Sequence, residues 1–97
     1  MKRRVRRKTS AARDVMLIGR SALRLLSGVS EHELVLWERE QWIEPVDYDA
    51  SGDAAEPLYD AAALRRVRLI RTLADELEVN TPGIDVILHL LDQFDGR

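Results

Sequence analysis

Few residues of this chain are of types that could do chemistry. The two histidines, His32 and His89, lie far apart, and neither has a second metal ligand at close spacing. A zinc site is therefore not expected. Adjacent acids such as Asp75-Glu76 usually lie solvated in turns or at helix ends, whereas acid–base catalysis needs a pocket that shifts a pKa. The chain has no Cys, which excludes disulfides and thiolate chemistry. We predict no catalytic residues, no metal, no cofactor and hence no enzyme.

Length and composition indicate one small globular domain. The chain has 97 residues, of which 45% are hydrophobic and 33% charged, and this is room for a single modest core. No stretch approaches the roughly 20 apolar residues of a membrane helix. The run Val15–Ile18 is too short for a signal peptide. We predict a cytoplasmic protein.

Charge is distributed unevenly along the chain. Residues 1–20 hold eight Lys and Arg against one Asp, a charge of +7, and the other 77 residues sum to −9. Residues 1–13 have no apolar periodicity, so we predict a disordered basic arm before a domain at 14–97. The arm is either a solvated tail, a tail that folds back on the acidic body, or a weak nucleic-acid contact. The arginines that would make this contact are Arg3, Arg4, Arg6 and Arg7.

Two short helices joined by a tight turn are predicted near the beginning of the domain. Residues 21–26 form the first helix, which Gly28 ends. Ser30 and Glu33 have the spacing of a capping box, in which each side chain bonds the backbone N–H of the other residue. The second helix spans about 31–41. This arrangement is a helix-turn-helix.

The second half of the chain predicts a polar turn and two more helices. Residues 47–57 read as a polar loop or hairpin, and Asp60 caps a helix at about 61–78. The buried stripe of that helix has steps of three and four: Leu64, Val67, Ile70, Leu73, Ala74 and Leu77. The last helix begins near Pro82, with Asn80 or Thr81 as its cap. The fold class is mainly α.

Several segments together resemble the MerR-type winged helix-turn-helix family. They are the helix-turn-helix junction Leu26–Ser30, the run Leu34–Arg39, the helix end Ile43–Pro45, and the segments Leu58–Asp60 and Arg68–Ile70 after the wing. The resemblance covers about residues 15–94. It implies about four helices and a small β-hairpin wing.

Within that superfamily, the run from Asn80 to Asp92 is similar to chaperone modulatory proteins of the CbpM type. This resemblance implies a protein that binds the J-domain of a DnaJ-type (CbpA-type) co-chaperone and inhibits its cooperation with Hsp70. An Asn-x-x-Gly-Ile run, here Asn80 to Ile84, also occurs in the DNA-binding repressor HspR. The alternative is therefore a DNA-binding transcriptional regulator of the MerR or HspR type. A third possibility is an antitoxin-like or scaffold module.

The positions that would face DNA favour the protein-binding reading. DNA-binding MerR relatives commonly have the sequence Arg-Thr-Leu-Arg-Tyr-Tyr in the second helix, where this chain has His-Glu-Leu-Val-Leu-Trp at 32–37. Leu34 and Trp37 keep core roles, whereas Val35 and Leu36 replace polar contacts. Four acids, Asp47, Asp49, Asp53 and Glu56, make the wing negative, so phosphates would be repelled.

We predict that the second helix binds a protein through an apolar patch with an acidic rim. The predicted partner-binding residues are Glu31, His32, Glu33, Val35, Leu36, Glu38 and Glu40. A rival face is the outer side of the last helix, with Asp85, His89 and Asp92. Trp42 is expected in the core. The protein is either a monomer or a small homodimer that pairs through the last two helices, with Leu90, Leu91 and Phe94 as candidates.

Overall fold

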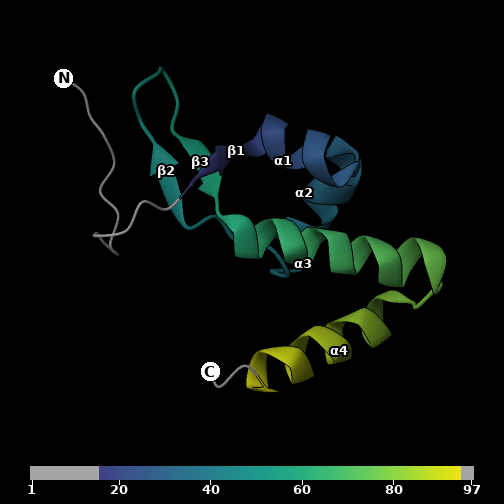
Figure 1. The fold of residues 1–97 in the computed structure, drawn as a ribbon. Helices are drawn as coiled ribbons and strands as arrows, with labels where there is room; N and C mark the ends of the chain where they lie inside the picture. Colours follow the sequence, from purple (N-terminus) through teal and green to yellow (C-terminus); the bar gives the residue numbers. More distant parts are fainter. Residues whose placement is uncertain (1–15, 95–97) are drawn as a thin grey trace.

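The computed structural model describes residues 16–94. The predicted basic arm therefore lies outside the described residues. The elements follow in the order β1 (Ile18–Gly19), α1 (Arg20–Ser27), α2 (Glu31–Arg39), β2 (Asp47–Asp49), β3 (Glu56–Tyr59), α3 (Ala61–Arg71), the π-helical turn η1 (Thr72–Glu76) and α4 (Thr81–Phe94). Figure 1 shows the small sheet at one end of α3, and α4 running back below α3.

The helix-turn-helix forms as its local chemistry predicts. Gly28 ends α1 in the left-handed conformation (φ 81°), and its N–H donates to Arg24 O at 2.7 Å. This positive φ favours glycine, and a Cβ here would also displace the Arg71 guanidinium, whose Nη1 would lie 2.7 Å away. The capping box is confirmed: Ser30 Oγ accepts from the Glu33 N–H at 3.0 Å, and Glu33 Oε1 accepts from the Ser30 N–H at 3.1 Å.

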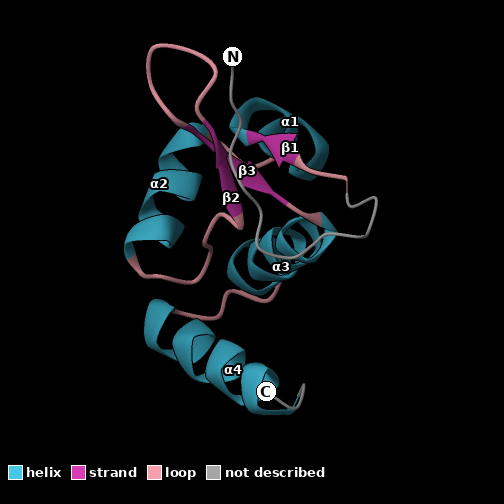
Figure 2. Ribbon diagram, turned by 90° about the vertical axis from the view of Figure 1, so that its left-hand side faces the viewer, coloured by secondary structure: helices cyan, strands magenta, loops and turns pink. Residues whose placement is uncertain are grey.

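A three-stranded antiparallel sheet lies at the beginning of α3 (Figure 1). Its strand order is β1-β3-β2, with β3 in the middle. The polar segment predicted as a loop or hairpin is the hairpin β2–β3, with Tyr48 opposite Pro57. Ile18, the last residue of the short apolar run, belongs to β1 and pairs with Tyr59. Figure 2 shows the three strands grouped together, with the long loop of the hairpin projecting from them.

The helix pair departs from the prediction at its turn. We predicted one helix over 61–78, but α3 passes into η1 after Arg71. The N–H of Leu77 donates to Thr72 O, five residues back. Such a turn holds an extra residue, so the side chains that follow it leave the α-helical stripe. Leu77 is consequently exposed rather than buried, and the prediction was wrong for this residue. Asn80, not Thr81, caps α4, because its Oδ1 accepts from the Gly83 N–H at 2.9 Å.

One hydrophobic core joins all four helices and the sheet. Leu34 and Trp37 of α2 are buried, as predicted, and so is Trp42 in the segment that follows. The complete core consists of Leu23, Val29, Leu34, Trp37, Trp42, Ile43, Tyr59, Ala63, Val67, Ile70, Leu73, Ile84 and Leu88. Among residues 16–94, no helix has the length and apolar character that crossing a membrane requires. The architecture is the predicted one: a mainly helical winged helix-turn-helix with four helices and a small hairpin wing.

Candidate partner-binding surface

The outer side of α2 exposes two neighbouring apolar residues. Val35 is 39% exposed and Leu36 is 38% exposed. On the inner side, Leu34 and Trp37 anchor the helix in the core. The orientation of α2 is therefore fixed by two large buried side chains, and Val35 and Leu36 remain accessible to solvent. The predicted exposure of these two residues is confirmed.

Most of the acids predicted around this patch are engaged within the fold. Glu33 belongs to the capping box. Glu31 and Glu38 both bind Arg20, the first residue of α1: Arg20 Nη2 lies 3.1 Å from Glu31 Oε2, and Arg20 Nη1 lies 2.6 Å from Glu38 Oε2. Tyr59 donates its hydroxyl to the same Glu38 oxygen at 2.6 Å. These acids stabilise α2 against α1 and β3, so their charge is largely compensated inside the molecule.

Within the Arg20 cluster the pKa of Glu31 is lowered, and the pKa values of Arg20 and Tyr59 are raised. The guanidinium of Arg20 donates to the Glu31 carboxylate and holds the pKa of Glu31 below its ordinary value. Burial, followed by the hydrogen bond to the Glu38 carboxylate, raises the pKa of Tyr59. The sequence alone does not reveal this cluster, because Arg20 lies 11 and 18 residues from its two acidic partners. No local spacing rule could have paired them.

The accessible part of the predicted site is smaller than the sequence suggested. We define the α2 face as His32, Val35, Leu36 and Glu40, which are all exposed. Neither His32 nor Glu40 forms a side-chain ion pair or hydrogen bond with residues 16–94. Arg39 is the one basic residue of α2 and lies in its last turn. The face can offer a partner an apolar centre, a carboxylate and an imidazole.

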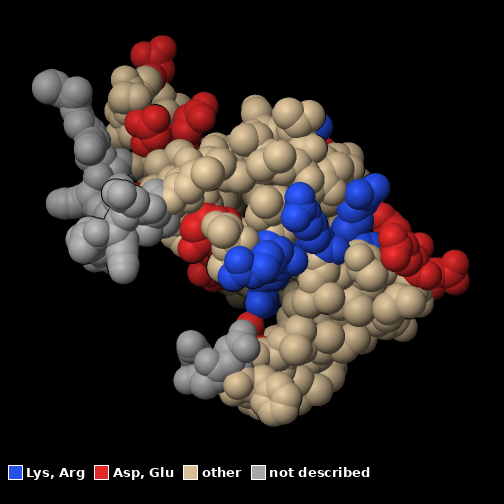
Figure 3. All heavy atoms as spheres, viewed as in Figure 1, with Lys and Arg blue, Asp and Glu red and all other residues tan. Residues whose placement is uncertain are grey.

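The distribution of charge does not suit DNA on this side of the fold. No Lys or Arg occurs between Arg39 and Arg65, a stretch that contains the whole wing. Three wing acids, Asp49, Asp53 and Glu56, are exposed, and Figure 3 shows acidic side chains gathered over the hairpin. Phosphate contacts need Lys and Arg, and added carboxylates repel the backbone.

The basic side chains visible in Figure 3 gather instead over the middle of the molecule, along α3. Two of the exposed arginines have structural partners here. Arg68 donates to Leu26 O at 3.2 Å, and Arg71 donates to Ser27 O at 3.0 Å. Cations at the last carbonyls of a helix are favourable. These two arginines thus stabilise the end of α1 and fasten α3 to it.

The rival face on α4 is exposed, as predicted, but two of its three residues already have partners within the fold. Asp85 accepts from Trp42 Nε1 at 2.9 Å. Asp92 binds Arg66 through both oxygens, at 2.7 and 3.1 Å. These two acids therefore hold α4 against the rest of the domain. His89 is exposed and lies between them on the same edge of the helix.

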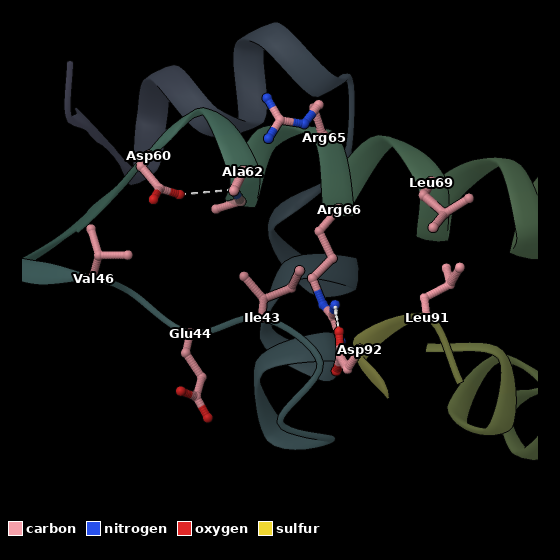
Figure 4. A pocket seen from close by; sticks show the side chains of 11 residues that line it. Ile43, Glu44, Val46, Asp60, Ala62, Arg65, Arg66, Leu69, Leu91 and Asp92 are labelled. Carbon is pink, nitrogen blue, oxygen red and sulfur yellow. Dashed lines mark hydrogen bonds and ion pairs between the residues drawn. The ribbon is translucent and has the colours of Figure 1, made fainter. Parts of the chain in front are cut away.

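A cavity of about 420 Å3 lies beside the Arg66–Asp92 ion pair, between the start of α3, the segment 43–46 and the end of α4. Ile43, Val46, Leu69 and Leu91 supply apolar walls. Figure 4 shows the Arg66–Asp92 pair at its floor. The polar groups of Arg66 are engaged with Asp92 and Trp42 O, and Glu44 and Arg65 are the other charged residues of the lining besides Asp60. Within residues 16–94, no cluster of acidic or His side chains is arranged to hold a metal ion.

The fold and the α2 surface define a regulatory winged helix-turn-helix domain. The profile of the MerR HTH family regulatory proteins matches residues 18–96. The protein belongs to this family, whose members are regulators rather than enzymes. No curated protein matches the chain in a sequence search.

Proposed function

We propose that this protein is a chaperone modulator of the CbpM type. In this proposal it acts in the cytoplasm, binds the J-domain of a DnaJ-type co-chaperone and inhibits the cooperation of that co-chaperone with Hsp70. The observation that carries the proposal is the α2 face, which presents Val35 and Leu36 where a DNA-reading helix needs polar side chains. The resemblance of residues 80–92 to CbpM-type proteins supplies the identity of the partner.

The proposed interface has an apolar centre and electrostatic surroundings. Val35 and Leu36 would become buried against the partner and provide most of the affinity. The acidic residues on α2 and in the wing attract a basic partner over a longer range and speed the encounter. J-domains, as a family, have a basic second helix, which suits this arrangement. Because Arg20 compensates part of the charge of Glu31 and Glu38, we assign the larger part of the binding energy to the apolar pair.

The test is a calorimetric titration of the purified protein with the J-domain of a DnaJ-type co-chaperone. We expect saturable binding of one J-domain per chain. The double variant Val35→Ser/Leu36→Ser should raise Kd by roughly 30-fold or more, because loss of an interface centre costs about 2 kcal/mol. The matched control is Leu25→Ser on α1, an even more exposed leucine (83%) outside the α2 face, and it should leave Kd unchanged.

Two results would overturn the proposal. One is the absence of heat and of any saturable signal with the J-domain at high micromolar concentration. The other is equal loss of affinity in the α1 control and in the α2 double variant, while circular dichroism shows that both variants are folded. In the first case, a parallel titration with duplex DNA would test the alternative of a MerR- or HspR-like transcriptional regulator.

A further inference from the structure

Helix α1 exposes two adjacent leucines that the core does not cover. Leu25 is 83% exposed and Leu26 is 51% exposed, whereas Leu23 anchors the helix in the core and is fully buried. Ala22 precedes the two leucines by three and four residues, so it shares their side of the helix. The helix contains no acidic residue. Because the buried Leu23 fixes the orientation of α1, its outer side is a preformed apolar patch.

A row of arginines on α3 lies beside this patch. Arg65, Arg68 and Arg71 follow one another at intervals of three residues and share one side of α3. Two hydrogen bonds join the row to the end of α1, from Arg68 to Leu26 O at 3.2 Å and from Arg71 to Ser27 O at 3.0 Å. Figure 3 shows basic side chains along α3, directly below the uncharged atoms of α1. The leucines and the arginines therefore belong to one continuous surface.

The arginine row still has N–H donors for a partner. A guanidinium carries five N–H donors, and the bond to Leu26 O uses one of those of Arg68. Arg71 also pairs with Asp75 at 3.6 Å, so part of its charge is compensated. Arg65 forms no side-chain hydrogen bond or ion pair with residues 16–94. In Figure 4 the Arg65 side chain extends to the opposite side of α3 from Arg66, away from the Arg66–Asp92 pair.

We define the α1–α3 surface as Ala22, Leu25, Leu26, Arg65, Arg68 and Arg71. We propose that this surface docks an acidic amphipathic helix of a partner protein. Packed helices lie about 8–10 Å apart, and a helix with its side chains is about 10–12 Å wide, so one added helix reaches both rows. Its apolar side covers the leucines, and its carboxylates accept from the guanidiniums, which suit planar carboxylates.

The chemistry of this surface favours a protein segment over nucleic acid. Phosphates are bound by cationic and polar groups, and two adjacent exposed leucines offer them nothing. Arg68 and Arg71 are in addition directed at carbonyl oxygens of α1. A basic partner, such as the one proposed for the α2 face, would be repelled by the arginine row. The inference therefore goes beyond the proposed function and does not rest on it, because the α2 face takes no part.

Fluorescence anisotropy with a labelled peptide tests the proposal on the full chain. The probe is a helix-forming peptide of about 18 residues, with leucines at steps of three and four and glutamates at most other positions. We expect saturable binding to the wild type, which weakens as salt is added because the arginines are exposed. The same peptide with lysine in place of every glutamate should not bind.

Substitutions at two positions test the placement of the interface. Leu25→Glu should raise Kd roughly tenfold or more, since it removes an apolar contact and adds a like charge. Arg65→Glu should raise Kd roughly fivefold and reduce the salt dependence, and Arg65→Lys, which keeps the charge, should stay close to the wild type. The matched controls are Leu90→Glu on α4 and Arg39→Glu on α2, which alter an exposed leucine and an exposed arginine elsewhere. Both controls should bind like the wild type, and circular dichroism verifies that all variants are folded.

Three results would overturn the proposal. The first is the absence of saturable binding between the glutamate peptide and the wild type at submillimolar concentration. The second is equal binding of the lysine peptide, or equal loss of affinity in Leu25→Glu and Leu90→Glu. The third comes from a parallel titration with duplex DNA: if DNA binds, Arg65→Glu weakens it and the peptide does not compete, the surface is a phosphate site instead.

Discussion

At the residue scale, Arg20 decides which acids of α2 are available to a partner. The sequence shows four glutamates around Val35 and Leu36 and predicts an acidic rim. In the fold, Arg20 binds Glu31 and Glu38, and Glu33 caps its own helix. Charge reversal at Glu31 and Glu33 would therefore disturb the fold as well as any interface. This is why the binding test uses the apolar pair instead.

Gly83 has an unusual requirement for a glycine inside a helix. Replacing helix glycines by alanine normally stabilises a protein. Here a Cβ would lie 2.7 Å from Val79 Cγ1 and 3.1 Å from the capping Oδ1 of Asn80. We expect Gly83→Ala to lower the free energy of unfolding by about 1–2 kcal/mol, because it displaces a cap. Urea denaturation measures the change. Gly52→Ala, whose Cβ meets nothing within 4 Å, is the control and should be neutral or stabilising; equal effects of both substitutions would refute the explanation.

Tyr59 should make stability fall at alkaline pH. Its pKa is raised by burial and by the Glu38 carboxylate, so the neutral phenol stabilises the fold fully below the unfolded pKa of about 10. Above that pH, the unfolded chain loses the proton first, and this contribution is progressively lost. Tyr59→Phe should cost about 1 kcal/mol at neutral pH. Urea titrations should show that the difference in free energy of unfolding between Tyr59→Phe and the wild type becomes smaller as pH rises beyond 10.

Tyr48, whose phenol is exposed on β2, provides the control substitution for Tyr59. Tyr48→Phe should follow the wild-type pH profile throughout. If the difference in free energy of unfolding between Tyr59→Phe and the wild type stays constant up to pH 11, the buried hydroxyl does not cause the loss of stability at alkaline pH.

At the element scale, helix beginnings are predictable and helix ends are less so. Ser30, Asp60 and Asn80 cap α2, α3 and α4 through bonds within three residues, and such contacts are encoded locally. The end of α3 depends on the turn that leads to α4. There the chain adopts a π-helical turn, and Glu78 takes a left-handed conformation with φ of 55°. Periodicity alone predicts a straight continuation and hence misplaces Leu77.

The docking of α4 depends on a hydrogen bond that the sequence does not reveal. Trp42 Nε1 donates to Asp85 across 43 residues. We expect Asp85→Ala to lower the free energy of unfolding by about 1–3 kcal/mol, because the indole N–H loses its partner in a mostly buried position. Asp85→Asn retains an acceptor oxygen and should cost less than half as much. If chemical denaturation gives Asp85→Ala and Asp85→Asn the same free energy of unfolding, the hydrogen bond of the indole N–H contributes little to stability.

At the scale of the whole molecule, the surface divides into regions of different character. The wing is acidic (Figure 3), Arg68 and Arg71 of α3 bind the end of α1, the α2 face is apolar at its centre, and α4 exposes Val86, Leu90 and Phe94. The net charge of −2 conceals all of this.

The sequence by itself determined the fold class, the order of the elements and core positions such as Leu34, Trp37 and Trp42. It could do so because caps, glycine stops and apolar spacing act between near neighbours. It also determined that α2 lacks a DNA-reading pattern, since this is a matter of residue identity.

Only the tertiary structure decided which charged residues are free. Pairs such as Arg20 with Glu38 and Arg66 with Asp92 join residues 18 and 26 positions apart, and no local rule encodes them. It also decided that Asp85 faces Trp42 and that Val86, Leu90 and Phe94 of α4 are left uncovered. The exposure of a side chain depends on which elements pack around it, and the folded chain alone sets that packing.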